Sequence, residues 1–202
     1  MDNNKQFWQK IAKLYAPFMK SNKKLYADIC QSIAPYLNKE MNVLELACGT
    51  GQLSYPLSEK VKSWEATDFS EKMIAEAKKK NCLQTLCFSV QDATDLPYDD
   101  NSFDAVVISN ALHIMPHPEK ALAQIKRILK TDGVLFAPTF VHGESTAFHI
   151  RTWLMERIGF YAYFKWNEAE YIDFLKNNGL CITETKMLGS NIVPLCFAVA
   201  KI

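Results

Sequence analysis

The chain has 202 residues, a length that suits one domain with one hydrophobic core. Lys and Arg number 23 against 22 for Asp and Glu, and this balance argues against a strongly basic surface for nucleic acid. No apolar run approaches the roughly 20 residues that span a bilayer, and the polar segment MDNNKQFWQK predicts no signal peptide. The six cysteines form neither a CxxC pair nor zinc-finger spacing, so we expect no metal, reduced thiols and a cytoplasmic location.

Two N-terminal segments carry apolar residues at helical spacing. The first covers residues 7–18, and Pro17 is expected to kink or end it. The second covers residues 25–37 and is interrupted near Pro35. The sequence therefore predicts two helices before the first strand.

From Asn42 onward, short apolar runs alternate with amphipathic helices. The expected strands are 42–47, 61–67, 85–90, 103–109 and 133–140, and the expected helices are 51–59, 70–80 and 118–130. Such alternation predicts a parallel sheet that is covered on both faces. Ligands of these sheets bind at the carboxyl ends of the strands, near the point where the strand order reverses. We therefore expect functional residues just after positions 47, 67, 90 and 109.

The ends of two helices carry local signals. Ser70 is expected to cap helix 70–80, whose lysine-rich end suits the helix dipole. Helix 118–130 is expected to close at Lys130, before a turn at Asp132–Gly133.

The last quarter of the chain differs from the alternating part. Residues 144–166 are rich in aromatic side chains, and Asn167 with Glu170 then forms a capping box for a further helix. The final two strands, which predict an antiparallel hairpin, are 180–187 and 193–200. The expected fold class is thus α/β, a Rossmann-like, doubly wound sheet that is mostly parallel and ends in this hairpin.

A glycine-rich turn follows the first expected strand, in the sequence VLELACGTGQL at 43–53. Gly49 and Gly51 let the backbone bend sharply and approach a ligand closely. The free N–H groups at the start of the next helix would face that ligand. Glu45 lies within the strand, where a carboxylate needs a partner such as an ammonium group or a bound water. The alternative is a tight strand–helix turn without a ligand.

Acidic residues follow the next two strands. Asp68 lies about 20 residues beyond the glycine loop, where a carboxylate can accept ribose hydroxyls, and Phe69 can pack on an adenine. The alternative for Asp68 is a helix cap, a role for which Ser70 competes. Asp92 can accept from an adenine amino group, and its alternative is an ordinary Asx turn. A glycine loop and two acids at successive strand ends favour a single adenosine-containing ligand.

Residues 43 to about 140 resemble the class I S-adenosylmethionine-dependent methyltransferases, in particular the branch of ubiquinone/menaquinone-biosynthesis C-methyltransferases. The resemblance rests on VLELACGTGQL, ATDFSEKMIAEAKKK and QDATDLPYDDNSFDAVVISNALHIMPHPEKALAQIKRILKTDGVL. The family's E/D-x-G-x-G-x-G pattern is present with Ala47 in place of the first glycine. After the fourth strand, SNAL at 109–112 differs from the Asn/Asp-Pro-Pro-Tyr/Phe of many exocyclic-amine methyltransferases and lacks the Pro-Cys of cytosine C5 enzymes.

The resemblance implies an enzyme whose cofactor is S-adenosylmethionine. The residues implied to bind it are Glu45 at the amino group; Ala47, Cys48, Gly49 and Gly51 at the methionine part; Asn110 and Ala111 under the sulfonium; Asp68 at the ribose; and Phe69, Met73, Asp92 and Ala93 at the adenine. It also implies a single domain, in which residues 1–40 form lid helices, 41–140 the cofactor-binding core, and 141–202 a substrate-side insertion and the hairpin.

The activity implied by the resemblance is methyl transfer to a small-molecule acceptor by in-line displacement. An activated methyl group mainly requires an aligned acceptor in a dry pocket, and a general base only where the acceptor arrives protonated. Candidate catalytic bases are His113, His142 and Tyr15, and a buried structural ring is the alternative for each. His117 is less well placed. Methylation of carbon, nitrogen, oxygen or sulfur stays open.

The acceptor pocket is expected between the N-terminal helices and residues 144–166, whose aromatic rings can hold a flat or apolar molecule or a cation. For these rings, ordinary core packing and a homodimer contact are the alternatives. Two other functions stay open for the chain. One is a non-catalytic adenosylmethionine-binding or scaffold protein. The other is a nicotinamide-dependent oxidoreductase, although GTGQLS lacks the third glycine of G-x-G-x-x-G.

Overall fold

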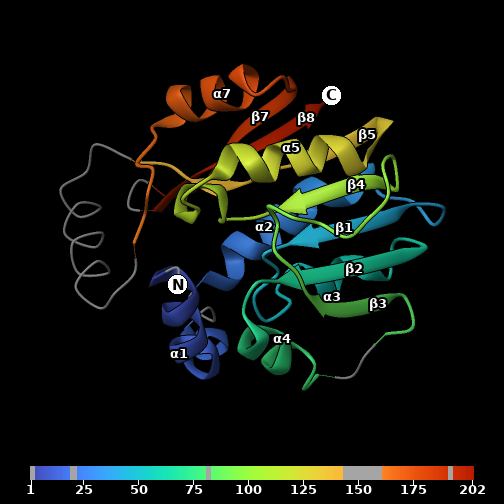
Figure 1. Cartoon of the computed structure of the whole chain (residues 1–202), viewed down its shortest axis with the longest axis vertical. Coiled ribbons are helices and arrows are strands. Elements are labelled where there is room, and N and C mark those ends of the chain that lie inside the picture. Colours follow the sequence, from blue (N-terminus) through green and yellow to red (C-terminus); the bar gives the residue numbers. More distant parts are fainter. Residues whose placement is uncertain (1–2, 19–21, 81–82, 143–160, 191–192) are drawn as a thin grey trace.

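The computed structural model describes residues 3–18, 22–80, 83–142, 161–190 and 193–202 (Figure 1). Within them, eight strands form one sheet of order β3-β2-β1-β4-β5-β8-β6, and β7 also pairs with β8. The strands are β1 Asn42–Leu46, β2 Ser63–Asp68, β3 Leu86–Val90, β4 Phe103–Ile108, β5 Leu129–Phe136, β6 Thr139–Phe140, β7 Cys181–Ser190 and β8 Val193–Lys201. Strands β1 to β5 are parallel, whereas β8 is antiparallel to β5, β6 and β7. The mostly parallel sheet and its C-terminal antiparallel hairpin are confirmed.

Helices cover both faces of this sheet. They are α1 Asn3–Phe18, α2 Lys23–Ile33, α3 Ser54–Ser58, α4 Glu71–Ala77, α5 Pro118–Ile128 and α7 Glu168–Asn177, with the short 3-10 helices η2 Ala34–Tyr36 and η3 Leu112–Ile114. One buried cluster joins α5 and α7 to one face, and a second joins α2, α3 and α4 to the other. The sheet is therefore doubly wound, as predicted.

Consecutive residues of the central strands point to opposite faces, and both faces are buried. In β1, Val43 packs in the α2 cluster and Leu44 in the α5 cluster. In β4, Ala105 and Val106 divide between the two clusters in the same way. Burying a Val or Leu side chain fully contributes about 1.5–3 kcal/mol. This two-sided burial is the reason that the central strands lack polar alternation in the sequence.

Two predicted helix caps are confirmed. The Ser70 hydroxyl accepts a hydrogen bond from the Met73 N–H at 3.3 Å, at the start of α4. At α7, the Asn167 side chain accepts from the Glu170 N–H at 3.0 Å, and the Glu170 carboxylate accepts from the Asn167 N–H at 2.9 Å. Each cap pairs N–H groups that have no partner inside the helix.

The segment after α5 differs from the prediction. The helix ends at Ile128 and the chain enters β5 at Leu129, so Asp132 and Gly133 lie inside a strand and form no closing turn. A register shift between β4 and β5 shows that the extra residues form a bulge. A Cβ on Gly133 would lie 2.6 Å from Cγ of Leu129, so the bulge closes tightly only because this residue is glycine.

Two other predicted element boundaries also differ from those in the structure. Residues 51–53 form a turn, so α3 begins at Ser54 and is shorter than the expected helix 51–59. The expected strand 133–140 divides into β5 and β6, because Pro138 between them has no N–H to continue the ladder. None of the described helices is long and apolar enough to cross a membrane.

Only the last six residues of the aromatic-rich segment 144–166 lie within the described residues. There, the rings of Phe164 and Trp166 stack with centroids 4.6 Å apart, and Trp166 stacks on Phe174 of α7 at 4.5 Å. These two rings of the segment therefore pack on the body of the protein, as one of the alternatives for them expected.

Candidate cofactor and acceptor site

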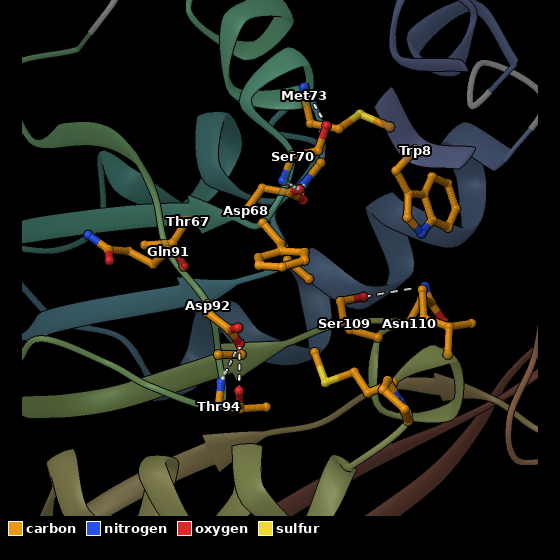
Figure 2. Close-up of a pocket in the computed structure, with 18 of the residues that line it drawn as sticks. Trp8, Thr67, Asp68, Ser70, Met73, Gln91, Asp92, Thr94, Ser109 and Asn110 are labelled. Atoms are coloured by element: carbon orange, nitrogen blue, oxygen red, sulfur yellow. Dashed lines mark hydrogen bonds between the residues drawn. The ribbon is translucent and has the colours of Figure 1, made fainter. Parts of the chain in front are cut away.

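A cavity of about 320 Å³ opens where β1, β2, β3 and β4 end (Figure 2). Its wall contains residues that follow each of these strands, together with Trp8 of α1 and the first turn of α5. The strand order reverses between β1 and β4, so the cavity lies at the edge where open α/β sheets bind ligands. Its volume falls in the range of small-molecule sites.

The loop after β1 has a left-handed backbone. The φ angle is 55° at Ala47, 57° at Gly49 and 81° at Gly51. A Cβ on Gly51 would lie 2.8 Å from the ring of Tyr55, so the loop needs glycine there. Ala47 adopts the left-handed region with a Cβ, at a cost of roughly 1–2 kcal/mol. Ala47 and Gly49 line the cavity, whereas Cys48 and Gly51 shape the loop without lining it.

Asp68 fixes the glycine loop to the end of β2. Its Oδ2 accepts a hydrogen bond from the Gly49 N–H at 2.9 Å, and its Oδ1 accepts from the Ser70 N–H at 2.8 Å. Burial raises the pKa of this carboxyl to about 6. Because the Ser70 side chain caps α4, Asp68 is not needed for that role. A carboxylate has about four lone-pair sites, so Asp68 can still accept hydrogen bonds from the hydroxyl groups of a ligand in the cavity that it lines.

Asp92 holds an Asx turn after β3. Its Oδ1 accepts from the Thr94 N–H at 2.9 Å and from the Thr94 hydroxyl at 2.8 Å (Figure 2). This turn is the alternative that the sequence left open, and it also sets Asp92 and Ala93 on the cavity wall. A ligand contact remains compatible with the turn, because both bonds use the same carboxylate oxygen.

Asn110 is held from two sides at the end of β4. Its φ is 54°, a region that Asn tolerates better than most residues. Its N–H donates to the Pro138 carbonyl at 2.8 Å, and its Oδ1 accepts from the Phe140 N–H at 3.2 Å. The strand end therefore presents Asn110 and Ala111 to the cavity from a fixed backbone.

Glu45 lies in β1, behind the glycine loop, and is not part of the cavity wall. The residue is 2% exposed, and its Oε2 accepts from the Ser54 hydroxyl and from Nε1 of Trp64, the latter at 2.9 Å. Burial raises the pKa of Glu45 to about 7 against the effect of these two bonds. The strand carboxylate thus has internal partners, and its contact with the cofactor's amino group stays a prediction.

Two of the predicted bases, His113 and His142, lie away from the described wall. His113 is buried in η3 with Nδ1 3.1 Å from Oγ1 of Thr139, and burial lowers its pKa to about 4. His142 donates its backbone N–H to the Trp166 carbonyl at 2.7 Å, and neither histidine lines the cavity. Tyr15 belongs to α1, and its side chain lies outside the described part of the structure. For His113, the geometry fits a buried, neutral ring.

Sequence reasoning missed the wall between β4 and α5. The residues that line the cavity there are Ile114, Met115, Pro116, His117 and Lys120. The sequence ranked His117 below His113, but His117 lines the cavity and His113 does not. Their position in the sequence could have indicated them, because this segment directly follows β4 at the same edge of the sheet.

Trp8 was also missed as a lining residue. It reaches the cavity from α1, opposite the side chains that follow β2 (Figure 2). Helix α1 packs beside α4, where Nε2 of Gln9 donates to Oε2 of Glu71 at 2.6 Å. Helical periodicity cannot reveal which residue of a distant helix faces a site, so the sequence held no signal for Trp8.

Most of the predicted cofactor residues meet in this one cavity. Those that line it are Ala47, Gly49, Asp68, Phe69, Met73, Asp92, Ala93, Asn110 and Ala111. Across the described ranges, no group of three His, Cys, Asp or Glu side chains could hold a metal ion.

Comparison with known proteins gives matches along the same part of the chain. Residues 44–137 match the family model described as a methyltransferase domain. A demethylmenaquinone methyltransferase of Renibacterium salmoninarum is 41% identical over 100 residues, which are 50% of this chain and 41% of that protein. The chain therefore matches less than half the length of this curated relative.

Two solved structures share the fold of this chain over most of its length. A methyltransferase described as putative, in complex with the Trm112 activator of Haloferax volcanii, has a TM-score of 0.80 at 21% identity and covers 96% of both chains. Magnesium protoporphyrin IX methyltransferase of Synechocystis, with bound S-adenosylhomocysteine (SAH), has a TM-score of 0.69 at 19% identity and covers 89% of this chain and 83% of that one. At these identities the likeness concerns the fold.

The sheet order, the glycine loop and the acids at successive strand ends define a Rossmann-like α/β domain with a ligand cavity at its switch point. The family match falls on the same strands, so residues 44–137 are similar to the methyltransferase domain of the class I S-adenosylmethionine-dependent family. The cofactor of that family is S-adenosylmethionine.

Proposed function

We propose that this chain transfers the methyl group of S-adenosylmethionine to a small-molecule acceptor by in-line displacement. The observation that carries the proposal is the single cavity in which residues from four strand ends converge. The position of the family match over β1 to β5 supports the same conclusion. Against a nicotinamide-dependent reaction, GTGQLS lacks the third glycine of G-x-G-x-x-G.

The described residues fit an adenosyl ligand. Asp68 lines the cavity with a carboxylate whose two oxygens each carry one backbone bond, so we propose that it accepts the ribose hydroxyls. Phe69 and Met73 border the same part of the wall and would flank the adenine, with Asp92 and Ala93 at its edge. We propose that the left-handed loop at Ala47–Gly51 lies against the methionine part.

The chain's main contribution to the reaction would be alignment. When bound, the cofactor supplies a methyl group on a positively charged sulfur, which needs no further activation. Asn110 and Ala111 would hold the sulfur end of the cofactor against a fixed backbone. Trp8 would help to exclude water from the cavity. Alignment of two reactants can lower a barrier by about 7–11 kcal/mol.

A general base is needed only for an acceptor that arrives protonated. His113, His142 and Tyr15 stay candidates for that role. A direct role for either histidine would require the cavity to extend beyond its described wall, because neither lines it now. We therefore propose that placement, with no obligatory base, accounts for most of the rate enhancement.

The acceptor would be a small apolar or flat molecule. Beyond the proposed cofactor residues, the wall offers apolar surface from Trp8, Ile114 and Met115, beside polar residues such as His117 and Lys120. A relative is described as a demethylmenaquinone methyltransferase, so quinone-like rings are the first acceptors to consider. We further propose a cytoplasmic protein with no nucleic-acid partner, because the described cysteines are unpaired and the net charge is +1.

Methyl transfer can be measured with cofactor labelled in its methyl group. The purified chain would be offered a panel of reduced quinones, phenols, amines and thiols. We expect label to move to at least one panel member, with reduced quinones foremost. SAH binding without transfer to any member would contradict the proposal and favour a non-catalytic binding protein.

A further inference from the structure

Strand β7 forms an edge of the sheet, and no other described strand pairs with its outer side. Among the described residues it pairs with β8 alone, over nine positions with a bulge between Ile182 and Glu184, and Figure 1 shows it at the opposite end of the sheet from β3. Most of its side chains are exposed. A row of backbone N–H and C=O groups along such an edge is a template for another strand.

A groove runs beside this edge. It has a volume of about 730 Å³ and lies between the outer stripe of α2, including Lys24 and Asp28, and residues of β7, including Glu184 and Lys186. The Tyr36 hydroxyl of η2 donates to the Glu184 carboxylate and ties the two walls together. A groove between a helix and an open strand edge is the geometry in which an added strand can pair.

The register of β7 decides which side chains face this groove. Glu184 pairs with Val199 and Lys186 pairs with Phe197 on β8. Val199 and Phe197 both belong to the buried cluster on the α2 face. Because paired residues of neighbouring strands share a face, Glu184 and Lys186 project on the α2 side, one residue on either side of Thr185.

The spacing of Glu184 and Lys186 allows two copies of β7 to pair with opposite charges facing each other. In an antiparallel pair of two β7 strands centred on Thr185, Glu184 of each copy lies opposite Lys186 of the other. Centring the pair on Glu184 or on Lys186 would instead bring identical charges together, which destabilises a strand pair. Of these three registers the charge pattern favours the one centred on Thr185, where a twofold axis satisfies both ion pairs at once.

We propose that β7 pairs with β7 of a second copy of this chain, antiparallel and centred on Thr185, so that two sheets join into one. The α2 helices of both copies then lie on the same face of the joined sheet. The proposed cofactor cavity opens at the ends of β1 to β4, so this interface leaves it free.

Sedimentation of the full chain over a range of micromolar concentrations tests the interface. We expect a concentration-dependent dimer. Lys186→Glu turns both ion pairs into like-charge pairs and should raise the dimer dissociation constant about tenfold or more. The double variant Glu184→Lys with Lys186→Glu exchanges the charges, restores both pairs and should recover most of the affinity.

The matched control is Lys62→Glu, which makes the same charge change at an exposed site before β2. It should leave the dimer unchanged, and SAH affinity should be the same in all variants, which shows that they are folded. A wild-type chain that stays monomeric throughout would overturn the proposal. A dimer that Lys186→Glu does not weaken would place the interface elsewhere and overturn it equally.

Discussion

At the scale of single residues, Asp68 carries two tasks with one carboxylate. It holds the Gly49 and Ser70 N–H groups, so it positions the glycine loop before any ligand arrives. The same side chain faces the cavity, where we propose that it accepts ribose hydroxyls. The sequence predicted Ser70 as the cap and left a cap as the alternative for Asp68, because it could not show that the Asp68 carboxylate binds the Gly49 N–H of the loop.

Replacement of Asp68 should weaken cofactor binding. A hydrogen bond to a charged acceptor contributes about 1.5–3 kcal/mol, so Asp68→Ala should lower SAH affinity at least about tenfold. Asp99→Ala, an exposed carboxylate outside the cavity wall, is the matched control. Calorimetric titration measures both, and unchanged affinity in a folded Asp68→Ala protein would rule out the ribose assignment.

Burial of Glu45 gives the ligand-free chain a pH-dependent stability. Its pKa is raised from 4.5 to about 7 in the fold, so its folded form binds a proton more tightly than its unfolded form. The stability that this proton contributes is fully present below about pH 4.5 and is lost as the pH rises through about 7. Asp68, whose pKa is raised to about 6, adds to the fall in the same direction.

Glu45→Gln removes the ionisation and keeps an acceptor for Ser54 and Trp64. The variant should therefore exceed the wild type in free energy of unfolding at pH 8, by about 3 kcal/mol at most, and should match it more closely at pH 4.5. Urea unfolding at both pH values, with the exposed Glu59→Gln as control, measures the difference. Parallel pH curves for wild type and Glu45→Gln would contradict this account.

At the scale of elements, the hydrophobic periodicity of the sequence was enough to predict a strand with two buried faces or a helix with one buried face. The runs at β1 and β4 divide between two clusters, and that demand leaves a clear apolar signature. The bulge in β5 left none, because it depends on a contact between Gly133 and Leu129 within the same strand. The sequence showed Asp132–Gly133 as a typical turn signal, and the pairing of β5 with β4 overrides it.

A substitution inside this bulge tests the assignment. Gly133→Ala puts a Cβ 2.6 Å from Cγ of Leu129, so we expect a loss of about 1–3 kcal/mol in the free energy of unfolding. Combining it with Leu129→Ala removes the contact with Leu129 and leaves the one with the Lys130 carbonyl oxygen at 2.8 Å, so the double variant should lose less than the sum of the two single losses. Strictly additive losses, measured by urea unfolding, would show that the two side chains do not meet.

At the scale of the whole molecule, the parallel sheet explains why so much of the site could be predicted. Strand ends meet at one edge, so residues far apart in the sequence, such as Ala47 and Asn110, had to converge there. No such rule predicts which residues form the acceptor side of the cavity. Its wall includes Trp8 from α1, which reaches the cavity through helix packing alone.

The central claim is that one cavity at the strand ends binds an adenosyl cofactor. Calorimetric titration of the purified chain with SAH, and separately with NAD, tests it most directly. We predict saturable binding of SAH at one site and no heat with NAD. A folded protein that binds neither SAH nor S-adenosylmethionine, or that binds only NAD, would contradict the account.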